Sequence, residues 1–176
     1  MRGALLAVAL LGLLASAWGA SAAPLNIVAL GASNTAGKGK GNHPGGVSRD
    51  QAYPAQLGAM LRAKGIDAYV RNAGIAGDTT GGMLRRMDSA VPNGTQIVIL
   101  QPGGNDARKG TGGESGANTA QITSKLEGRG IKVILLELSA YAPSSTRDPD
   151  GEHYNAQGHA AVAAGLLPRV LAAAGN

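Results

Sequence analysis

The sequence of residues 26–35 is Asn-Ile-Val-Ala-Leu-Gly-Ala-Ser-Asn-Thr, an apolar run that ends in small and polar residues. Continuous apolar runs of this kind are typical of strands that a parallel sheet buries on both faces. Residues 95–100 and 131–138 form two more such runs, and segments with apolar residues at helical spacing lie between them. The alternation predicts an α/β fold, in which a mostly parallel sheet is sandwiched between two layers of helices.

The same patterns place the individual elements. Strands are expected at 26–30, 67–72, 95–100 and 131–138, and helices at 51–64, 80–90, 117–127 and 155–174. Pro168 lies inside the last helix and should kink or split it. Since no internal repeat or long linker interrupts the chain, residues 23–176 are expected to form one domain.

Residues with catalytic potential lie at the ends of the predicted strands. Ser33, Gly77 and Asn105 follow the first three strands, and Asp150 and His153 lie just before the last helix. Open α/β sheets have their sites at the carboxyl ends of the strands, so these residues should lie close together. In this order the blocks resemble the SGNH, or GDSL-type, hydrolase family, and the resemblance covers nearly the whole chain after residue 22. The motifs are most similar to those of bacterial exported esterases, thioesterases and lysophospholipases.

The residue types suit acyl transfer. A serine hydroxyl is a weak nucleophile until a base takes its proton, and His153 is the candidate base for Ser33. Asp150, three residues before it, can accept a hydrogen bond from the other ring nitrogen and stabilise the imidazolium. The resemblance assigns the oxyanion hole to the backbone N–H groups of Ser33 and Gly77 and to the side-chain amide of Asn105. It implies a reaction without a metal or a cofactor.

Two features depart from the family pattern. The family's first block usually has Asp where this chain has Ala32, a loss expected to affect loop rigidity more than chemistry. The resemblance also implies a flavodoxin-like strand order 2-1-3-4-5. Asp150 follows Asn105 by only 45 positions, which is short for a helix and a fifth strand, so the sheet is expected to be shortened by one strand. A short acyl group is favoured, because the missing segment would otherwise help to line a long groove.

The N-terminus has the pattern of a secretory signal. Residues 1–22 combine Arg2, an apolar stretch and a final Ala-Ser-Ala, which favours cleavage after Ala22 and a secreted or periplasmic protein without stable membrane insertion. A retained membrane anchor is the alternative, because residues 3–23 are uncharged. The chain has no cysteine, which excludes disulfides and a thiol nucleophile.

Composition restricts the partners. Beyond residue 22 the chain has 15 Lys and Arg against 11 Asp and Glu, no Phe and no Trp, so it lacks the aromatic platforms and the basic stripe of nucleic-acid-binding proteins. The expected partner is a small-molecule, glycan or lipid ester. His43 is expected to be solvated and His159 to pack in the last helix. Arg108 and Lys109 flank the predicted cleft, where they either attract an anionic substrate or, as we favour, are only solvated.

The sequence therefore predicts an exported serine esterase that hydrolyses carboxylic esters or thioesters through an acyl-enzyme on Ser33. One alternative is a non-catalytic carbohydrate-binding relative that keeps the fold. Another is a nucleotide-binding phosphate loop at residues 31–38, Gly-Ala-Ser-Asn-Thr-Ala-Gly-Lys. Five residues rather than four separate its glycines, and Gly39 takes the place of the Ser or Thr that would hold magnesium, so this alternative is disfavoured.

Overall fold

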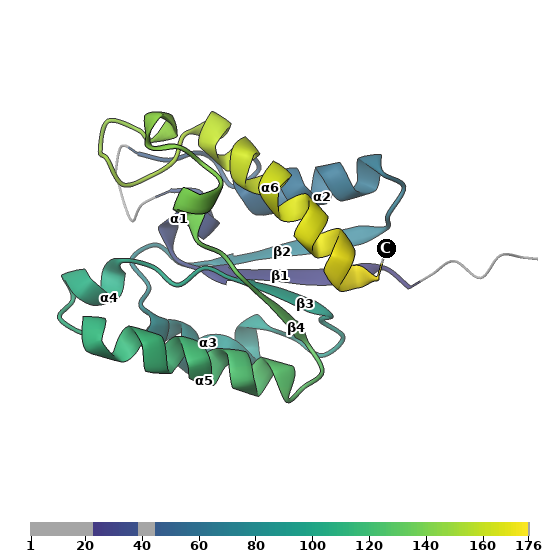
Figure 1. Cartoon of the computed structure of the whole chain (residues 1–176), viewed down its shortest axis with the longest axis horizontal. Helices are drawn as coiled ribbons and strands as arrows, with labels where there is room; N and C mark the ends of the chain where they lie inside the picture. Colours follow the sequence, from purple (N-terminus) through teal and green to yellow (C-terminus); the bar gives the residue numbers. More distant parts are fainter. Residues whose placement is uncertain (1–22, 39–44, 176) are drawn as a thin grey trace, which may run out of the picture.

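A computed structural model describes residues 23–38 and 45–175 of the chain. The predicted signal segment 1–22 and His43 lie outside the described residues, so both assignments stay predictions. Figure 1 shows three layers, with the sheet between α2 and α6 on one face and α3 and α5 on the other. The predicted α/β sandwich is therefore confirmed.

The sheet of the described residues has four parallel strands in the order β2-β1-β3-β4. The strands are β1 (Leu25–Gly31), β2 (Ala68–Gly74), β3 (Ile97–Leu100) and β4 (Lys132–Leu135). This is the predicted order without a fifth strand. Within the apolar run 131–138 the strand ends at Leu135, and the chain later forms short 3-10 turns, η2 (Leu138–Ala140) and η3 (Ser144–Thr146).

Six helices and one further 3-10 turn complete the described part of the chain. They are α1 (Ser33–Ala36), α2 (Tyr53–Ala63), α3 (Thr80–Ala90), α4 (Asn105–Arg108), η1 (Gly112–Glu114), α5 (Ser115–Glu127) and α6 (Ala156–Ala174). Pro168 does not split α6, contrary to one of the two outcomes expected of it. Leu166 and Val170 on either side of it are fully buried, and this packing outweighs the one backbone hydrogen bond that proline removes.

The core has two halves because β1 alternates between the faces of the sheet. Ile27 and Ala29 pack with α2 and α6, whereas Val28 and Leu30 pack with α3 and α5. Burial on both faces explains why the run in β1 is continuously apolar. It also makes β1 a rigid support for the turn that follows it.

Arginine side chains cover both outer strands of the sheet. On β4, Arg169 of α6 donates from Nη1 to the carbonyl oxygen of Leu135 (3.0 Å) and to the hydroxyl of Tyr141 (2.9 Å). On β2, Arg49 donates from Nη2 to the carbonyl oxygen of Asn72. Each outer strand thus has at least one backbone acceptor satisfied by an arginine side chain.

Candidate active site

Ser33 lies at the turn directly after the central strand β1, as the first residue of α1. Gln101, the residue after β3, holds this turn, because its Oε1 accepts from the N–H of Ala32 (3.2 Å) and from Oγ1 of Thr35 (3.1 Å). The first N–H groups of a helix have no acceptor within the helix. Ser33 therefore lies just beyond the end of β1 with its N–H in the first turn of a helix, and the residue is only 7% exposed.

Asp150 and His153 form a hydrogen-bonded pair. Oδ2 of Asp150 lies 2.7 Å from Nδ1 of His153. Oδ1 of Asp150 accepts the backbone N–H groups of Glu152 (2.8 Å) and His153 (2.9 Å), so one carboxylate organises the whole turn. His153 is only 2% exposed, which keeps its ring in a single orientation.

The hydrogen bonds of this turn also act on the ionisation of Asp150. Desolvation by burial opposes the charged form, but the hydrogen bonds from the backbone and ring of His153 and from the backbone of Glu152 outweigh it. Together they lower the pKa of Asp150 to about 2. The group is a carboxylate at any pH near neutrality, as a partner of an imidazolium must be.

Asn34, the residue next to Ser33, joins the two halves of the site. Its Nδ2 donates to the carbonyl oxygen of Glu152 (3.3 Å), and its Oδ1 accepts the N–H of Tyr154 (3.1 Å). These two groups lie on either side of His153, so the Asn34 side chain sets the position of the histidine turn relative to the serine turn. Sequence analysis missed Asn34, because a polar residue beside a candidate nucleophile has no distinguishing pattern.

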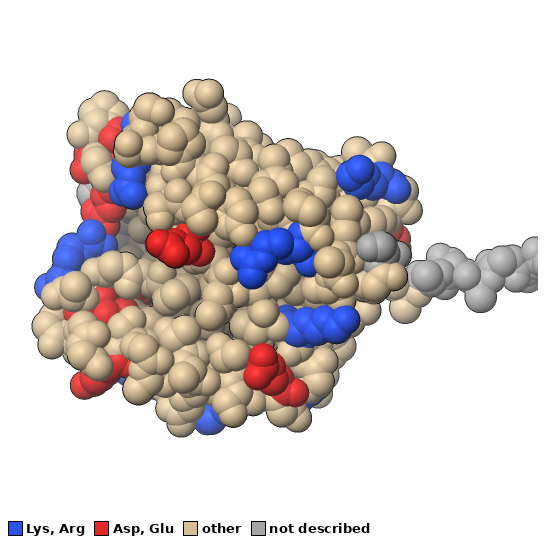
Figure 2. Space-filling view, in the orientation of Figure 1, with Lys and Arg blue, Asp and Glu red and all other residues tan. Residues whose placement is uncertain are grey.

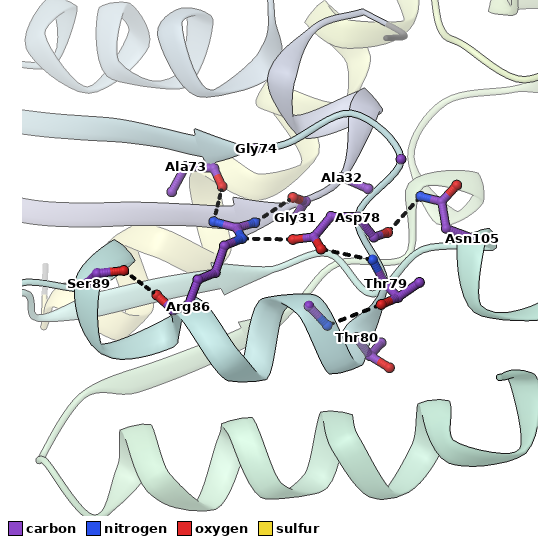
Figure 3. Close-up of polar contacts among 12 residues, drawn as sticks. Gly31, Ala32, Ala73, Gly74, Asp78, Thr79, Thr80, Arg86, Ser89 and Asn105 are labelled. Carbon is purple, nitrogen blue, oxygen red and sulfur yellow. Dashed lines mark hydrogen bonds and ion pairs between the residues drawn. The ribbon is translucent and has the colours of Figure 1, made fainter. Parts of the chain in front are cut away.

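Asn105 and Asp78, the residue after Gly77, meet at the next junction of the site (Figure 3). Gly77 has a φ of +75° in a turn closed by a hydrogen bond from the N–H of Asp78 to the carbonyl oxygen of Ile75 (3.1 Å). A positive φ at this position of a turn requires glycine. Asn105, the first residue of α4, donates from Nδ2 to the carbonyl oxygen of Asp78 (2.7 Å), so its amide lies against the Gly77 turn.

Arg86 anchors that turn to the sheet, as Figure 3 shows. Its Nε pairs with Oδ2 of Asp78 at 2.7 Å, and its two Nη groups donate to the carbonyl oxygens of Ala73 (2.8 Å) and Gly31 (3.0 Å). A second buried carboxylate, Asp106, accepts the N–H (3.0 Å) and the hydroxyl (2.6 Å) of Thr80 at the start of α3. The Gly77 turn is thus held from two sides by residues that the sequence did not single out.

A cavity of about 300 Å³ lies over these junctions. Its lining includes Ser33 and Asn105, together with Glu152 and Tyr154, the two neighbours of His153. Gly77, Asp150 and His153 are not part of the lining, but each is next in the chain or hydrogen-bonded to a residue that contacts or forms it: Asp78 is bonded to Asn105, and Glu152 lies beside His153 and donates to Asp150. In Figure 2 charged side chains of both signs surround a hollow at the left, the side on which the strands end.

The two basic residues after Asn105 make specific contacts. Arg108 donates from Nη2 to Oδ1 of Asn105 and forms an ion pair with Oε1 of Glu152, and Lys109 donates from Nζ to the carbonyl oxygen of Gly77 (2.6 Å). The interpretation of both side chains as merely solvated is wrong. A four-residue helix turns them back toward the site, which a sequence pattern of this length does not reveal.

His159 lies in α6 behind the site and is fully buried, in keeping with the predicted packing role. Its Nδ1 accepts the N–H of Tyr53 (3.2 Å), and its ring stacks on the Tyr53 ring at a centroid distance of 6.4 Å. Burial lowers the pKa of His159 to about 4, with the charge of Asp148 opposing and that of His153 adding to the shift. The ring is therefore neutral in the folded protein at neutral pH.

This neutral histidine predicts a pH-dependent stability. Between pH 6.5 and 4 the unfolded chain binds a proton at His159 that the folded chain does not, so the free energy of unfolding should fall by up to about 3 kcal/mol as the pH falls. Urea unfolding at several pH values measures this slope. The His159→Asn variant keeps an acceptor for Tyr53 but does not titrate, and its slope should be smaller. Equal slopes in both proteins would contradict the assignment.

The described residues contain neither a cluster of metal-ligating side chains nor a helix that could span a membrane. Over 23–38 and 45–175, no three or more His, Cys, Asp and Glu side chains are grouped so that they could hold a metal ion. Within the same ranges, none of the helices combines the length and the apolar character needed to cross a bilayer.

Comparison with known proteins identifies the family. The model of the GDSL-like lipase/acylhydrolase family matches residues 29–168. Esterase TesA of Pseudomonas aeruginosa is 33% identical over 93 residues, which are 52% of this chain and 46% of TesA, so the match spans about half the length of that relative. AlinE4, an SGNH-hydrolase family esterase, is 27% identical with a TM-score of 0.57 over 87% of this chain and 74% of AlinE4. The psychrotrophic esterase EstA of a Pseudoalteromonas species has the same fold, with a TM-score of 0.70 at 17% identity over 86% of this chain and 99% of EstA. The resemblance predicted from the four sequence blocks is confirmed: the chain belongs to the GDSL-like lipase/acylhydrolase family.

Proposed function

We propose that this protein is an exported serine esterase that hydrolyses carboxylic esters or thioesters through an acyl-enzyme on Ser33. One observation carries the proposal. The hydrogen-bonded pair of Asp150 and His153 is tied through Asn34 to the turn that presents Ser33. These contacts support a joint role for the proposed nucleophile, base and orienting group, which come from two ends of the chain.

Acylation would begin with attack of the Ser33 hydroxyl oxygen on the carbonyl carbon of the ester. His153 takes the hydroxyl proton on Nε2 while Nδ1 stays bonded to Asp150. The tetrahedral intermediate then collapses, and the same proton passes to the leaving alkoxide or thiolate. In deacylation, a water molecule attacks the acyl-enzyme by the same proton transfers and releases the carboxylic acid.

The negative charge that develops on the carbonyl oxygen needs donors that are already in place. Asn105 Nδ2 carries two hydrogens, one of which is bonded to the carbonyl oxygen of Asp78, and the second is available to the oxyanion. The N–H of Ser33 at the start of α1 and the N–H of Gly77 in the adjacent turn are the proposed backbone donors. Loss of one donor of this kind typically costs ~100- to 1000-fold in turnover.

Export is proposed from the composition of residues 1–22 alone, which have the charge, apolar stretch and small-residue ending of a cleaved signal. The protein would then act in the periplasm or outside the cell. Small-molecule, glycan and lipid esters all meet the chemical requirement of an acyl group on oxygen or sulfur.

Turnover and labelling together test the function. The purified protein should hydrolyse p-nitrophenyl acetate, which a non-catalytic carbohydrate-binding relative would not do. A fluorophosphonate should inhibit it and add one phosphonyl group to the peptide that contains Ser33. EstA is known in a form inhibited by monoethylphosphonate. No turnover, or a label on any other serine, would refute the proposal.

A further inference from the structure

Arg108 contacts both the proposed oxyanion donor and the histidine turn. A single guanidinium nitrogen, Nη2, donates to Oδ1 of Asn105 and pairs with Oε1 of Glu152. Asn105 and Glu152 come from different elements, α4 and the turn before α6, and all three residues line the cavity that contains Ser33. The described residues thus contain a polar link across the cavity, from the oxyanion side to the residue before His153.

The contact with Asn105 selects one orientation of the amide. An asparagine side chain has a donor end and an acceptor end, which exchange when the amide flips. In the structure the donor end faces the carbonyl oxygen of Asp78 and the acceptor end faces Arg108. After a flip, two acceptors would face each other at Asp78 and two donors at Arg108. In the observed orientation one N–H of Asn105 is bonded to Asp78, and the other is left for an oxyanion.

The ion pair with Glu152 holds the guanidinium in place for this purpose. The side chains of Arg108 and Glu152 are 52% and 34% exposed, and exposed ion pairs contribute little to stability. Their value here is geometric. Glu152 is the backbone neighbour of His153, and its N–H is bonded to Asp150, so the same link connects the orientation of the oxyanion donor with the turn of the base.

We propose that Arg108 is a positioning residue, which fixes the Asn105 amide with its donor end toward the oxyanion while Glu152 holds the guanidinium. This inference rests on the proposed esterase function. It assigns to Arg108 a role in the transition state, without direct contact with substrate.

Kinetics of Arg108→Met test the role. This variant keeps most of the side-chain length but has no donor, so the Asn105 amide loses one of its two orienting contacts and is held only by the carbonyl oxygen of Asp78. We expect kcat for p-nitrophenyl acetate to fall about tenfold, less than the ~100- to 1000-fold expected for loss of the donor in Asn105→Ala. KM should change less than about twofold, because the lost interaction is made only in the transition state. Arg108→Lys keeps a donor and a charge and should recover most of the loss. Glu152→Gln should cost less than Arg108→Met.

A double-mutant cycle separates positioning from a general structural effect. In the Asn105→Ala background, Arg108→Met should have no further effect on kcat, because the amide that it positions is gone. Arg71 is an exposed residue of β2 that lies away from the cavity. Arg71→Met makes the same substitution as Arg108→Met and should leave kcat and the melting temperature unchanged.

Three results would overturn the inference. They are an unchanged kcat in Arg108→Met, a rise in KM alone, and an equal loss of kcat with and without Asn105. The esterase proposal is tested separately by the wild-type protein and its Ser33→Ala variant. If wild type is active and Ser33→Ala is not, a negative result with Arg108→Met refutes only the role of Arg108. An inactive wild type refutes both.

Discussion

Replacing Ser33 with alanine is expected to abolish ester hydrolysis and to leave the fold intact. In serine proteases, loss of the nucleophile lowers kcat by about 10⁶-fold, and a fall of this order would bring the rate to the detection limit. The turn itself should not change, because it depends on backbone groups and on Gln101, whose Oε1 holds Ala32 and Thr35. The substitution removes one hydroxyl oxygen at a helix start, where alanine fits the same backbone.

The measurement is hydrolysis of p-nitrophenyl acetate together with the thermal midpoint. Ser124→Ala, an exposed serine of α5, is the matched control and should retain full activity. If Ser33→Ala keeps turnover near the wild-type rate, Ser33 is not the nucleophile. If its thermal midpoint falls by many degrees, the loss of activity reflects destabilisation of the fold and not loss of the hydroxyl.

The second large effect is expected for Asp150→Asn, with a loss of activity of order ~10⁴-fold. The amide oxygen can still accept the N–H groups that Oδ1 now accepts, so the turn should persist. The amide NH₂ would then face Nδ1 of His153 in place of Oδ2. A donor there favours the tautomer with a bare Nδ1 and a protonated Nε2, and this ring cannot take the proton of Ser33.

Asp148→Asn is the matched control two residues earlier. Asp148 is half-buried, and its Oδ2 accepts the N–H of Gly46 at 2.5 Å. An amide oxygen can accept the same bond, so this variant should keep most of its activity. If Asp148→Asn is the inactive variant and Asp150→Asn the active one, the orienting carboxylate has been misassigned.

The fold could be predicted from the sequence because its signals are local. The apolar run in β1 has to be buried on both faces, and only a central parallel strand meets that requirement. The limit of this reasoning is visible at residues 131–138, which were expected to form one strand. Leu136 belongs to the hydrophobic core and Leu138 packs against it, and both also line the cavity; hydrophobicity alone does not separate these roles from a place in a strand.

The site could be predicted only in part. Ser33 and Asn105 were found because each follows a strand, and Asp150 and His153 because three residues of spacing allow a contact within one turn. Asn34, Arg86 and Arg108 were missed or underrated, because each contacts segments that are distant in sequence. Arg86, for example, bonds to the ends of both β1 and β2. Contacts of this kind depend on which backbone carbonyls lie near the side chain in the folded protein. The local sequence around a helical arginine is the same whether the side chain bonds to such carbonyls or is solvated.

The arginines on the two outer strands have a consequence for association between molecules. An uncovered edge strand can pair with a strand of another chain, and such pairing leads to aggregation. Leu135 on β4 is 47% exposed, so an open edge there would be apolar as well as unpaired. Arg169 and Arg49 each occupy a strand carbonyl and place a positive charge beside it. When two copies approach edge to edge, their arginines repel each other and the carbonyl oxygen is already hydrogen-bonded. These side chains, which have no proposed part in catalysis, therefore disfavour strand pairing between molecules.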